Sequence, residues 1–408
     1  MRKVGILSLL ITLAWPLWEG RVQLRPQPAS LQAAVKKQVG LLKPDFQAFL
    51  NDYEAELLQR FRQEGVPGGA FAIVKNGAIA SIRTFGYRTE QELLPVDEHT
   101  VFRIASLSKG MTGLLAASMV KDSFLNWEAP LSSFCSDSLR FYDDDYAEQL
   151  QLQHLLSHTT GLPRHTYSHL LNVGWPYEQI LNMLPNVAPS HQVGVYHNYQ
   201  NVAFNLAGDM LQMAGGKSLE ALMRERFFQP LGMLNASASY SGMIESENRA
   251  MPMRRARGGY QPAILEPDYY EVPAAAGVNA SIRDMANYLK MAMGARPEVL
   301  DSSAMQQAFA PFVEIPAGDA SLRNWYGYGL KDAHYGMGWR IMQTEDYKII
   351  GHSGYVNYYR AEIAFNPAED IGIVLLTNAP NYTVGSSIPD FFQRYHERFR
   401  LPKTQPCS

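Results

Sequence analysis

The sequence predicts an α/β fold in which an antiparallel sheet is formed from both ends of the chain and a helical segment is inserted between them. A hairpin pattern occurs at 70–84, and a second pair of strand-like runs occurs at 359–377. Between them, residues from about 115 to 260 show helical patterns with little strand character. With 408 residues, 46% of them hydrophobic, the chain is long enough to bury a large core.

The first expected elements are a helix and a hairpin. Apolar residues recur at helical spacing from Phe46 to Glu64, and Gly65 then ends the helix. Two apolar runs follow, Ala70–Val74 and Ala78–Thr84, joined by Lys75-Asn76-Gly77. Asn-Gly between strand-like runs is the strongest short signal of a β-hairpin.

Later elements follow from the same periodicities. In the middle of the chain, Asn201–Ala214 and Ser218–Phe228 have helical patterns. A capping box at 281–284 predicts a helix that ends near Met293. A final helix fits Ser386–Phe399, whose aromatic residues form an apolar stripe. The late strands are Tyr359–Phe365 and Gly372–Thr377, separated by turn-forming residues at 366–370.

The first 18 residues have the pattern of an export signal. Arg2 and Lys3 precede an apolar run from Val4 to Trp18, which is shorter than the roughly 20 residues needed to cross a bilayer. We expect a cleaved signal peptide and a periplasmic location; because 17–20 offers no small-residue cleavage site, an uncleaved N-terminal anchor is the alternative. The expected parts are 1–18 (signal or anchor), 19–43 (linker), 44–400 (folded domain) and 401–408 (tail).

Charge and cysteine content limit the partners. The net charge is −3 and the basic residues form no cluster, which argues against nucleic acid or an anionic membrane surface. We therefore expect a small-molecule or peptide substrate, no cofactor, and membrane contact only through an uncleaved N-terminus. Cys135 and Cys407 are the only cysteines, which permits one disulfide without predicting it. The oligomeric state is not predicted.

Ser106 and Lys109 form the most informative pair in the chain. They stand three residues apart at the start of an expected helix that ends at Lys121, so their side chains share one face. A lysine shielded from water has a lowered pKa and can assist removal of the serine proton, which makes the pair a candidate acylation site. Taken alone, the pattern favours a polar helix start capped by Thr100, Ser106 or Ser108.

Two overlapping candidates for a second element are Tyr196-His197-Asn198 and Tyr199-Gln200-Asn201. A phenol near a cationic lysine loses its proton more readily, so a tyrosine beside Ser106 would take the serine proton and return it to a leaving group. The asparagine would offer a donor and an acceptor to a substrate amide. With 22 tyrosines, a triplet of this kind also arises by chance.

A third element, Gly351-His352-Ser353-Gly354, follows an apolar pair. A strand beside the nucleophile would supply one backbone N–H to an oxyanion, and glycine would leave room for substrate. His352 would add a donor or a group that titrates near physiological pH. In isolation, a turn between two strands is equally consistent. The Gly-x-Ser-x-Gly nucleophile elbow is excluded because Tyr355 stands where the second glycine is required.

A cluster of histidines raises zinc as an alternative. His154, His158, His165 and His169 form two pairs with i, i+4 spacing. No glutamate follows His154 as the zinc protease motif requires, and the turn at 159–163 separates the pairs. We therefore expect no metal, and chelator-insensitive activity would eliminate a zinc-dependent hydrolase.

Three elements that carry chemistry occur in one order along the chain: Ser106…Lys109, Tyr199…Asn201 and His352…Gly354. Together they resemble the serine β-lactamase and penicillin-binding-protein superfamily, closest to class C β-lactamases with their esterase and peptidase relatives. The segments 155–163 and 335–339 are also similar to family motifs, so the resemblance covers about 45–400. It favours the triplet at Tyr199, because Phe204 and 206–208 match the family residues that follow this motif.

The resemblance implies a β-lactamase-like α/β sandwich plus an all-helical domain, with the site between them. It implies the following roles: Ser106 as the acylated nucleophile, Lys109 as its activator, Tyr199 as the proton shuttle, Asn201 as the residue that orients substrate, the backbone N–H groups of Ser106 and Tyr355 as the oxyanion hole, and His352, Ser353 and Gly354 as further substrate-binding residues.

The third element departs from the family pattern. β-Lactamases have Lys-Thr-Gly where this chain has His352-Ser353-Gly354, so a group that is mostly neutral at pH 7 replaces a fixed charge that would bind a β-lactam carboxylate. We expect an exported serine hydrolase that cleaves an ester or amide, in a β-lactam, a D-amino acid peptide or a small ester, through a Ser106 acyl-enzyme. The alternative is a penicillin-binding or sensing protein of the same fold that does not turn over.

Overall fold

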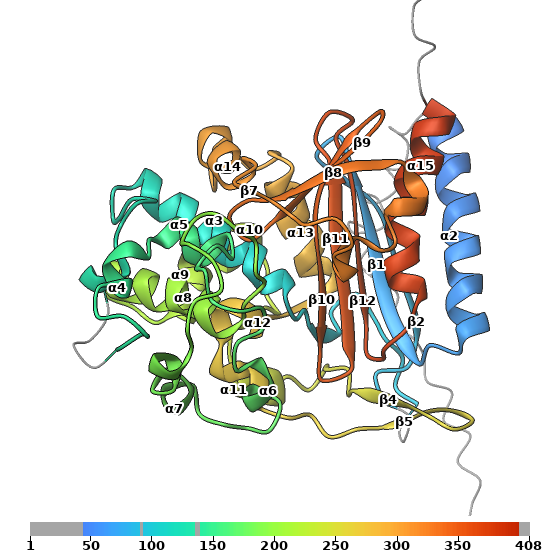
Figure 1. The fold of residues 1–408 in the computed structure, drawn as a ribbon. Coiled ribbons are helices and arrows are strands. Elements are labelled where there is room, and N and C mark those ends of the chain that lie inside the picture. Colours follow the sequence, from blue (N-terminus) through green and yellow to red (C-terminus); the bar gives the residue numbers. More distant parts are fainter. Residues whose placement is uncertain (1–43, 90–92, 135–138, 400–408) are drawn as a thin grey trace, which may run out of the picture. The chain divides into compact units, whose positions relative to one another are not determined.

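The computed structural model describes residues 44–89, 93–134 and 139–399 (Figure 1). Its largest element is an eight-stranded sheet in which all neighbouring strands are antiparallel. In spatial order the strands are β2 (Ala78–Gly86), β1 (Gly68–Lys75), β12 (Ile371–Thr377), β11 (Tyr359–Asn366), β10 (Lys348–Val356), β9 (Arg340–Thr344), β8 (Leu330–Tyr335) and β7 (Val313–Glu314). The predicted sheet from both ends of the chain is confirmed.

The two ends of the chain meet where β1 pairs with β12. Ile73 lies opposite Ile373 in this pair, and every residue of β12 is buried. Strands that are covered on both faces have continuous apolar sequences, which is why both runs could be recognised. The predicted hairpin between β1 and β2 turns at Asn76 and Gly77, both with positive φ, as a two-residue type I′ turn requires.

Helices cover both faces of the sheet. On one face, at the right of Figure 1, α2 (Pro44–Glu64) packs with α15 (Thr383–Phe399) through aromatic contacts such as Phe49 with Phe391 at 5.8 Å. On the other face, α13 (Ile282–Ala292) packs on β1 and β12. Its capping box is formed as predicted, because the Ser281 and Asp284 side chains each accept from the other residue's backbone N–H.

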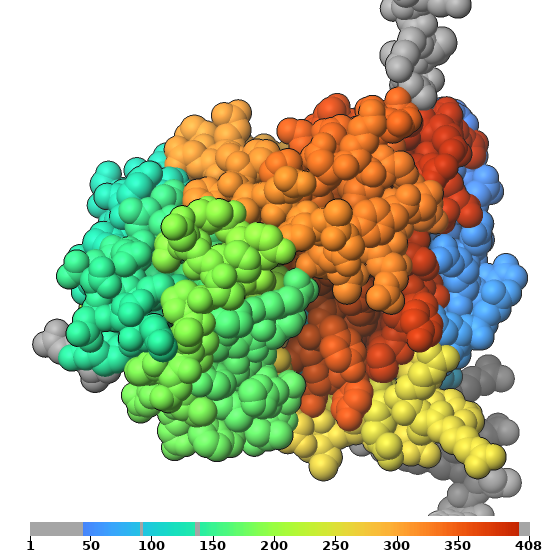
Figure 2. Space-filling view, in the orientation of Figure 1, coloured from blue at the N-terminus to red at the C-terminus, as the bar shows by residue number. Residues whose placement is uncertain are grey.

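A helical part built from the middle of the chain lies beside this sandwich. Its main helices are α3 (Leu107–Lys121), α4 (Tyr146–Gln149), α5 (Leu152–Leu156), α6 (Ser168–Leu171), α7 (Tyr177–Leu181), α8 (Val202–Gly215), α9 (Leu219–Met223), α10 (Gln229–Leu231), α11 (Tyr240–Glu245), α12 (Pro273–Ala276) and α14 (Ser302–Ala308). Figure 2 shows a hollow on one face, between the green segment of this part, the red strands and the yellow segment.

Some short elements were not predicted. β3 (Val101–Arg103) pairs with β6 (Asn279–Ser281), and β4 (Met253–Ala256) forms a hairpin with β5 (Gly259–Pro262) at the end of the range expected to be helical. Strands of three or four residues are too short to show a period of two. The predicted helix at 218–228 is α9 followed by a π-helical turn, Arg224–Phe228.

The predictions for the chain ends fall outside the described residues. These are the signal or anchor at 1–18, the linker at 19–43 and the tail at 401–408; Cys135 and Cys407 also lie outside them. Among the residues that are described, no helix has both the length and the apolar composition that a membrane crossing requires.

Helix α3 is the central helix of the molecule. Every residue of Leu107–Met119 is buried, so the helix has neighbours on all sides. Its glycines allow the segment before β9 to pack directly on it: a Cβ at Gly113 would lie 1.8 Å from the Met337 carbonyl oxygen. Trp339 Nε1 donates to the Gly110 carbonyl at 3.1 Å. This close contact holds the first two turns of α3 in place.

Replacing Gly113 with alanine should therefore destabilise the protein. In an ordinary helix this change stabilises by roughly 0.5–1 kcal/mol, whereas here the added methyl group would collide with backbone and should cost about 1–3 kcal/mol. Urea denaturation measures the difference. In the control Gly327→Ala the added carbon meets no atom within 4 Å, so the free energy of unfolding should change by less than about 0.5 kcal/mol. Equal stability of the two variants would contradict the contact.

Candidate active site

Ser106 stands at the junction between β3 and α3. Ala105 has a φ of 52°, a left-handed conformation that is uncommon outside glycine, and it turns the chain into the helix. The Ser106 side chain occupies the N-cap position but makes no capping hydrogen bond. Ser108 is not a cap either, because its hydroxyl donates to the Ala105 carbonyl at 2.6 Å. The Ser106 hydroxyl is therefore left for other partners.

Lys109 is fully buried, and its amine is surrounded by oxygen atoms. Nζ lies 2.8 Å from Asn201 Oδ1, 3.0 Å from the Ala275 carbonyl oxygen and 3.3 Å from Ser106 Oγ. Burial, with Arg340 nearby, holds the pKa of Lys109 well below its usual range and favours the neutral amine. A neutral amine has two N–H donors, and the two carbonyl oxygens accept both. Its lone pair is therefore directed at the Ser106 hydroxyl.

Tyr199 lies at the same serine. Its hydroxyl is hydrogen-bonded with the Ser106 side chain, and its ring centroid lies 4.8 Å from Lys109 Nζ. The competing triplet is placed elsewhere, since Tyr196 is 38% exposed and stacks on His191. The structure thus brings the second triplet, and not the first, to the candidate nucleophile.

The protonation of Tyr199 differs from the sequence-based expectation. Burial raises the pKa of Tyr199, and the opposing charge of Arg340 does not reverse this direction. The expectation that a cationic lysine would promote a phenolate is therefore wrong, because Lys109 is itself driven toward the neutral form. The geometry instead provides a neutral amine as proton acceptor and a neutral phenol as proton donor.

Strand β10 brings the third element beside the nucleophile. A Cβ at Gly354 would lie 2.9 Å from Ser106 N and 2.8 Å from the Ile104 carbonyl oxygen, so only glycine permits this approach. In the described chain, the Ile104 and Leu107 N–H groups donate to backbone carbonyls, whereas the Ser106 N–H does not. This N–H lies at the positive end of the α3 dipole, and Tyr355 directly follows Gly354 on β10. Both residues predicted to form the oxyanion hole therefore lie on segments that meet at Ser106.

His352 has no free ring nitrogen for a substrate. Its Nδ1 lies 2.8 Å from the Ser353 carbonyl oxygen and its Nε2 lies 2.8 Å from the Tyr335 hydroxyl. A carbonyl can only accept, so Nδ1 carries the hydrogen and the Tyr335 hydroxyl donates to Nε2. Burial, with Arg340, holds the pKa of His352 well below its usual range. His352 therefore links β10 to Tyr335. It has no free N–H for a substrate, unlike the donor that the sequence analysis expected.

The cation of the site is Arg340, at the start of β9, which the sequence analysis missed. It lies opposite Gly351 in the sheet, and its Cζ is 5.8 Å from the ring centroids of Tyr199 and Tyr335. The side chain is buried, and Nε and Nη1 have no hydrogen-bond partner among the described residues. Because buried N–H groups are nearly always bonded, these two need a partner such as a water molecule or a ligand oxygen. The only signal in the sequence was its position directly after the 335–339 motif.

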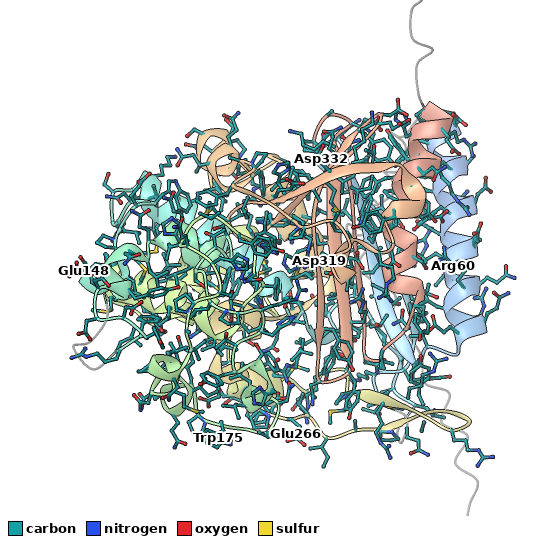
Figure 3. All side chains as sticks on the ribbon, viewed as in Figure 1. Arg60, Glu148, Trp175, Glu266, Asp319 and Asp332 are labelled. Atoms are coloured by element: carbon teal, nitrogen blue, oxygen red, sulfur yellow. The ribbon has the colours of Figure 1, made fainter. Side chains whose placement is uncertain are left out.

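Arg340 forms no ion pair with a carboxylate among the described residues. Asp319, labelled in Figure 3, pairs instead with Arg164 at 2.5 Å. Burial raises the pKa of Glu362 to about 7, so this carboxyl is partly protonated at neutral pH. Glu362, Arg340 and the predicted substrate-binding residue Ser353 line one small cavity.

The clustered histidines lie in different surroundings. His158 is buried against Tyr199, with ring centroids 4.2 Å apart, and His165 contacts the same ring at 5.6 Å. His154 instead packs against Phe312. Within the described ranges, no group of three or more His, Cys, Asp or Glu side chains is placed to hold a metal ion.

Comparison with known proteins identifies the family. The Beta-lactamase family model matches residues 48–389, which is most of the chain, and the chain belongs to this family. A solved structure, an octameric penicillin-binding protein homologue from Pyrococcus abyssi, superposes with a TM-score of 0.74 at 22% identity, covering 85% of this chain and 77% of that chain. At this identity the likeness shows the fold alone. The predicted β-lactamase-like α/β fold is confirmed.

Curated relatives are distant. Unguisins hydrolase ungD' from Aspergillus campestris (strain IBT 28561) is 23% identical over 367 residues, which cover 85% of this chain and 64% of that protein. Protein flp from Staphylococcus aureus (strain N315) is 23% identical over 328 residues, which cover 79% of this chain and 62% of that protein. The chain thus spans somewhat less than two thirds of the length of these relatives.

Proposed function

We propose that the protein is an exported serine hydrolase that cleaves an ester or amide bond through an acyl-enzyme on Ser106. The observation that carries this proposal is the buried Lys109 amine, whose two donors are taken by Asn201 and Ala275 and whose third neighbour is Ser106 Oγ. Export is supported by the sequence of residues 1–18 alone.

The acylation step follows from the positions of these groups. Lys109 Nζ takes the proton of the Ser106 hydroxyl as Oγ attacks the substrate carbonyl carbon, and the backbone N–H groups of Ser106 and Tyr355 stabilise the resulting oxyanion. Tyr199 donates its phenolic proton to the leaving group as the bond to the carbonyl carbon breaks, and Lys109 returns a proton to Tyr199. Water then releases the acyl group from Ser106 in a second addition.

Arg340 narrows the substrate class. Its buried, unpartnered Nε and Nη1 favour a substrate with a carboxylate near the scissile bond, because a buried cation without an anion is unfavourable. β-Lactams and peptides that end in a D-amino acid both carry such a carboxylate, whereas small neutral esters do not. In this protein Arg340 would supply the charge that the lysine of the third motif supplies in β-lactamases, which His352 does not.

The nucleophile is tested by labelling the native protein and Ser106→Ala with a cephalosporin and with a short activated ester, followed by mass spectrometry. We expect an adduct on Ser106 and a loss of turnover of at least about 1,000-fold in the variant, because no other group replaces the attacking oxygen. A lasting adduct without product would instead indicate a penicillin-binding or sensing protein. Full activity in Ser106→Ala would refute the proposal.

The base is tested by Lys109→Arg, which places a permanently protonated side chain where a neutral amine is expected and so cannot accept the serine proton. Loss of a general base should lower kcat/KM by about 100- to 10,000-fold. In the native protein, the pH profile of kcat/KM should reach its plateau well below pH 10.5, because burial lowers the pKa of Lys109. The exposed control Lys331→Arg should keep native activity. A profile that climbs to pH 10.5 would contradict a neutral Lys109.

The anion site is tested by Arg340→Gln with a cephalosporin and its methyl ester. Loss of charge-assisted hydrogen bonds should lower kcat/KM for the free acid by roughly 10- to 100-fold. The methyl ester lacks the carboxylate, so it should be affected much less, and its turnover also reports whether the variant is folded. Equal effects on both substrates would show that Arg340 does not bind the carboxylate.

A further inference from the structure

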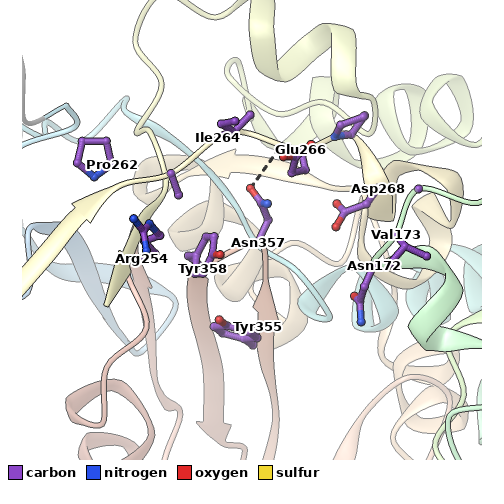
Figure 4. Close-up of a pocket in the computed structure, with 13 residues that line it drawn as sticks. Asn172, Val173, Arg254, Pro262, Ile264, Glu266, Asp268, Tyr355, Asn357 and Tyr358 are labelled. Carbon is purple, nitrogen blue, oxygen red and sulfur yellow. Dashed lines mark hydrogen bonds between the residues drawn. The ribbon is translucent and has the colours of Figure 1, made fainter. Parts of the chain in front are cut away.

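A cavity of about 940 Å³ opens beside the proposed acylation site. It lies in the hollow of Figure 2 and is shown in Figure 4, where Tyr355 of β10 and Asp268 of the segment after β5 are among its walls. Ligand pockets in proteins typically measure about 300–1,000 Å³, so this cavity is at the upper end of the range. An acetyl group would fill only a small fraction of it.

Both walls of the cavity lead into the candidate active site. Tyr355 directly follows Gly354, which packs on the backbone of Ser106. On the opposite wall, Asp268 is followed by Tyr269, which is hydrogen-bonded with the Asn201 side chain. A substrate chain attached to the Ser106 oxygen would therefore extend into this space.

The walls carry a mixture of groups that suits a peptide. Asn172 and Asn357 offer amide groups, which can pair with a main chain, while Val173 and Ile264 are 70% and 73% exposed and offer apolar contacts. Tyr358 adds an aromatic face. Neither a uniformly apolar lining, as an acyl lipid would prefer, nor a cluster of cations is present among these residues.

Of the two carboxylates that line the cavity, Asp268 and Glu266, one is free to bind a cationic group of a ligand. Asp268 is paired with Arg103 at 3.5 Å, and Arg254 donates to Gln261 within its own hairpin at 3.0 Å. The Glu266 carboxylate has no ion-pair partner among the described residues. Its backbone is held in place, because its N–H donates to Asn357 Oδ1 and its carbonyl accepts from Arg103.

We propose that this cavity binds the acyl part of the substrate, that the substrate is an extended peptide, and that Glu266 binds a free amine on it. This inference rests on the proposed acyl-enzyme function and specifies its substrate class. The cavity then determines which acyl groups reach Ser106, while Arg340 acts on the other side of the reacting carbonyl.

The test uses three activated esters with the same leaving group, whose acyl parts are acetyl, an N-acetylated tripeptide and the same tripeptide with a free amine. The native protein should prefer the tripeptide esters to the acetyl ester by tenfold or more in kcat/KM. Ala263→Trp, which fills the cavity, should lower this preference at least tenfold. An unchanged preference would overturn the inference.

Glu266→Gln tests the charge. It should reduce the preference for the free amine over the N-acetylated tripeptide by about threefold, the effect expected of an exposed ion pair. The matched control Glu148→Gln, on α4 and far from Glu266 in Figure 3, should leave the preference unchanged. If Glu266→Gln and Glu148→Gln showed the same preference for the free amine, Glu266 would not bind the amine. If no ester acylates Ser106, including the acetyl ester, the proposed function itself is wrong. If the acetyl ester acylates Ser106 but the tripeptide esters are not preferred, only the inference about the cavity is wrong.

Discussion

The whole site depends on keeping the Lys109 amine away from water. An ammonium group in water holds its proton near pH 10.5, and only burial lowers the pKa of Lys109 far enough for the amine to accept a proton at neutral pH. Burial in turn needs α3 to be covered on all sides, with Gly110 and Gly113 allowing Trp339 and its segment to approach the helix backbone. Stability and chemistry therefore rest on the same contacts.

Burial and a nearby cation affect the protonation of two residues in the candidate site. Burial, together with the charge of Arg340, disfavours protonation of both Lys109 and His352, which favours a neutral amine and a neutral imidazole. His352 then uses both ring nitrogens to fix Tyr335 and β10. In this arrangement burial and one nearby cation together disfavour the charged forms of Lys109 and His352, and the cation keeps two N–H groups without a partner among the described residues. A histidine at the position of a binding lysine becomes a positioning residue.

Much of the fold and part of the candidate site could be predicted from the sequence, because short stretches of the chain contain the signals. The Asn76-Gly77 hairpin, the apolar runs of β11 and β12 and the box at Ser281 have signals within a few residues. Ser106 and Lys109 were recognisable because one helical turn brings them together. The short strands β3 to β6 and the role of Arg340 were not, since their partners are distant in the chain.

The sequence by itself identified Ser106 and Lys109 as a candidate pair and located the hairpin of β1 and β2, the strands β11 and β12 and several of the longer helices, because spacing within a turn or a hairpin is a local property. Tertiary structure decided the directions of the pKa shifts: burial raises the pKa of Tyr199, whereas burial together with the charge of Arg340 lowers the pKa values of Lys109 and His352. Both ring nitrogens of His352 are also occupied by hydrogen bonds. Tertiary structure also decided that Tyr199 and not Tyr196 meets Ser106, and that a large cavity lies beyond Tyr355. These properties depend on distances between segments far apart in sequence.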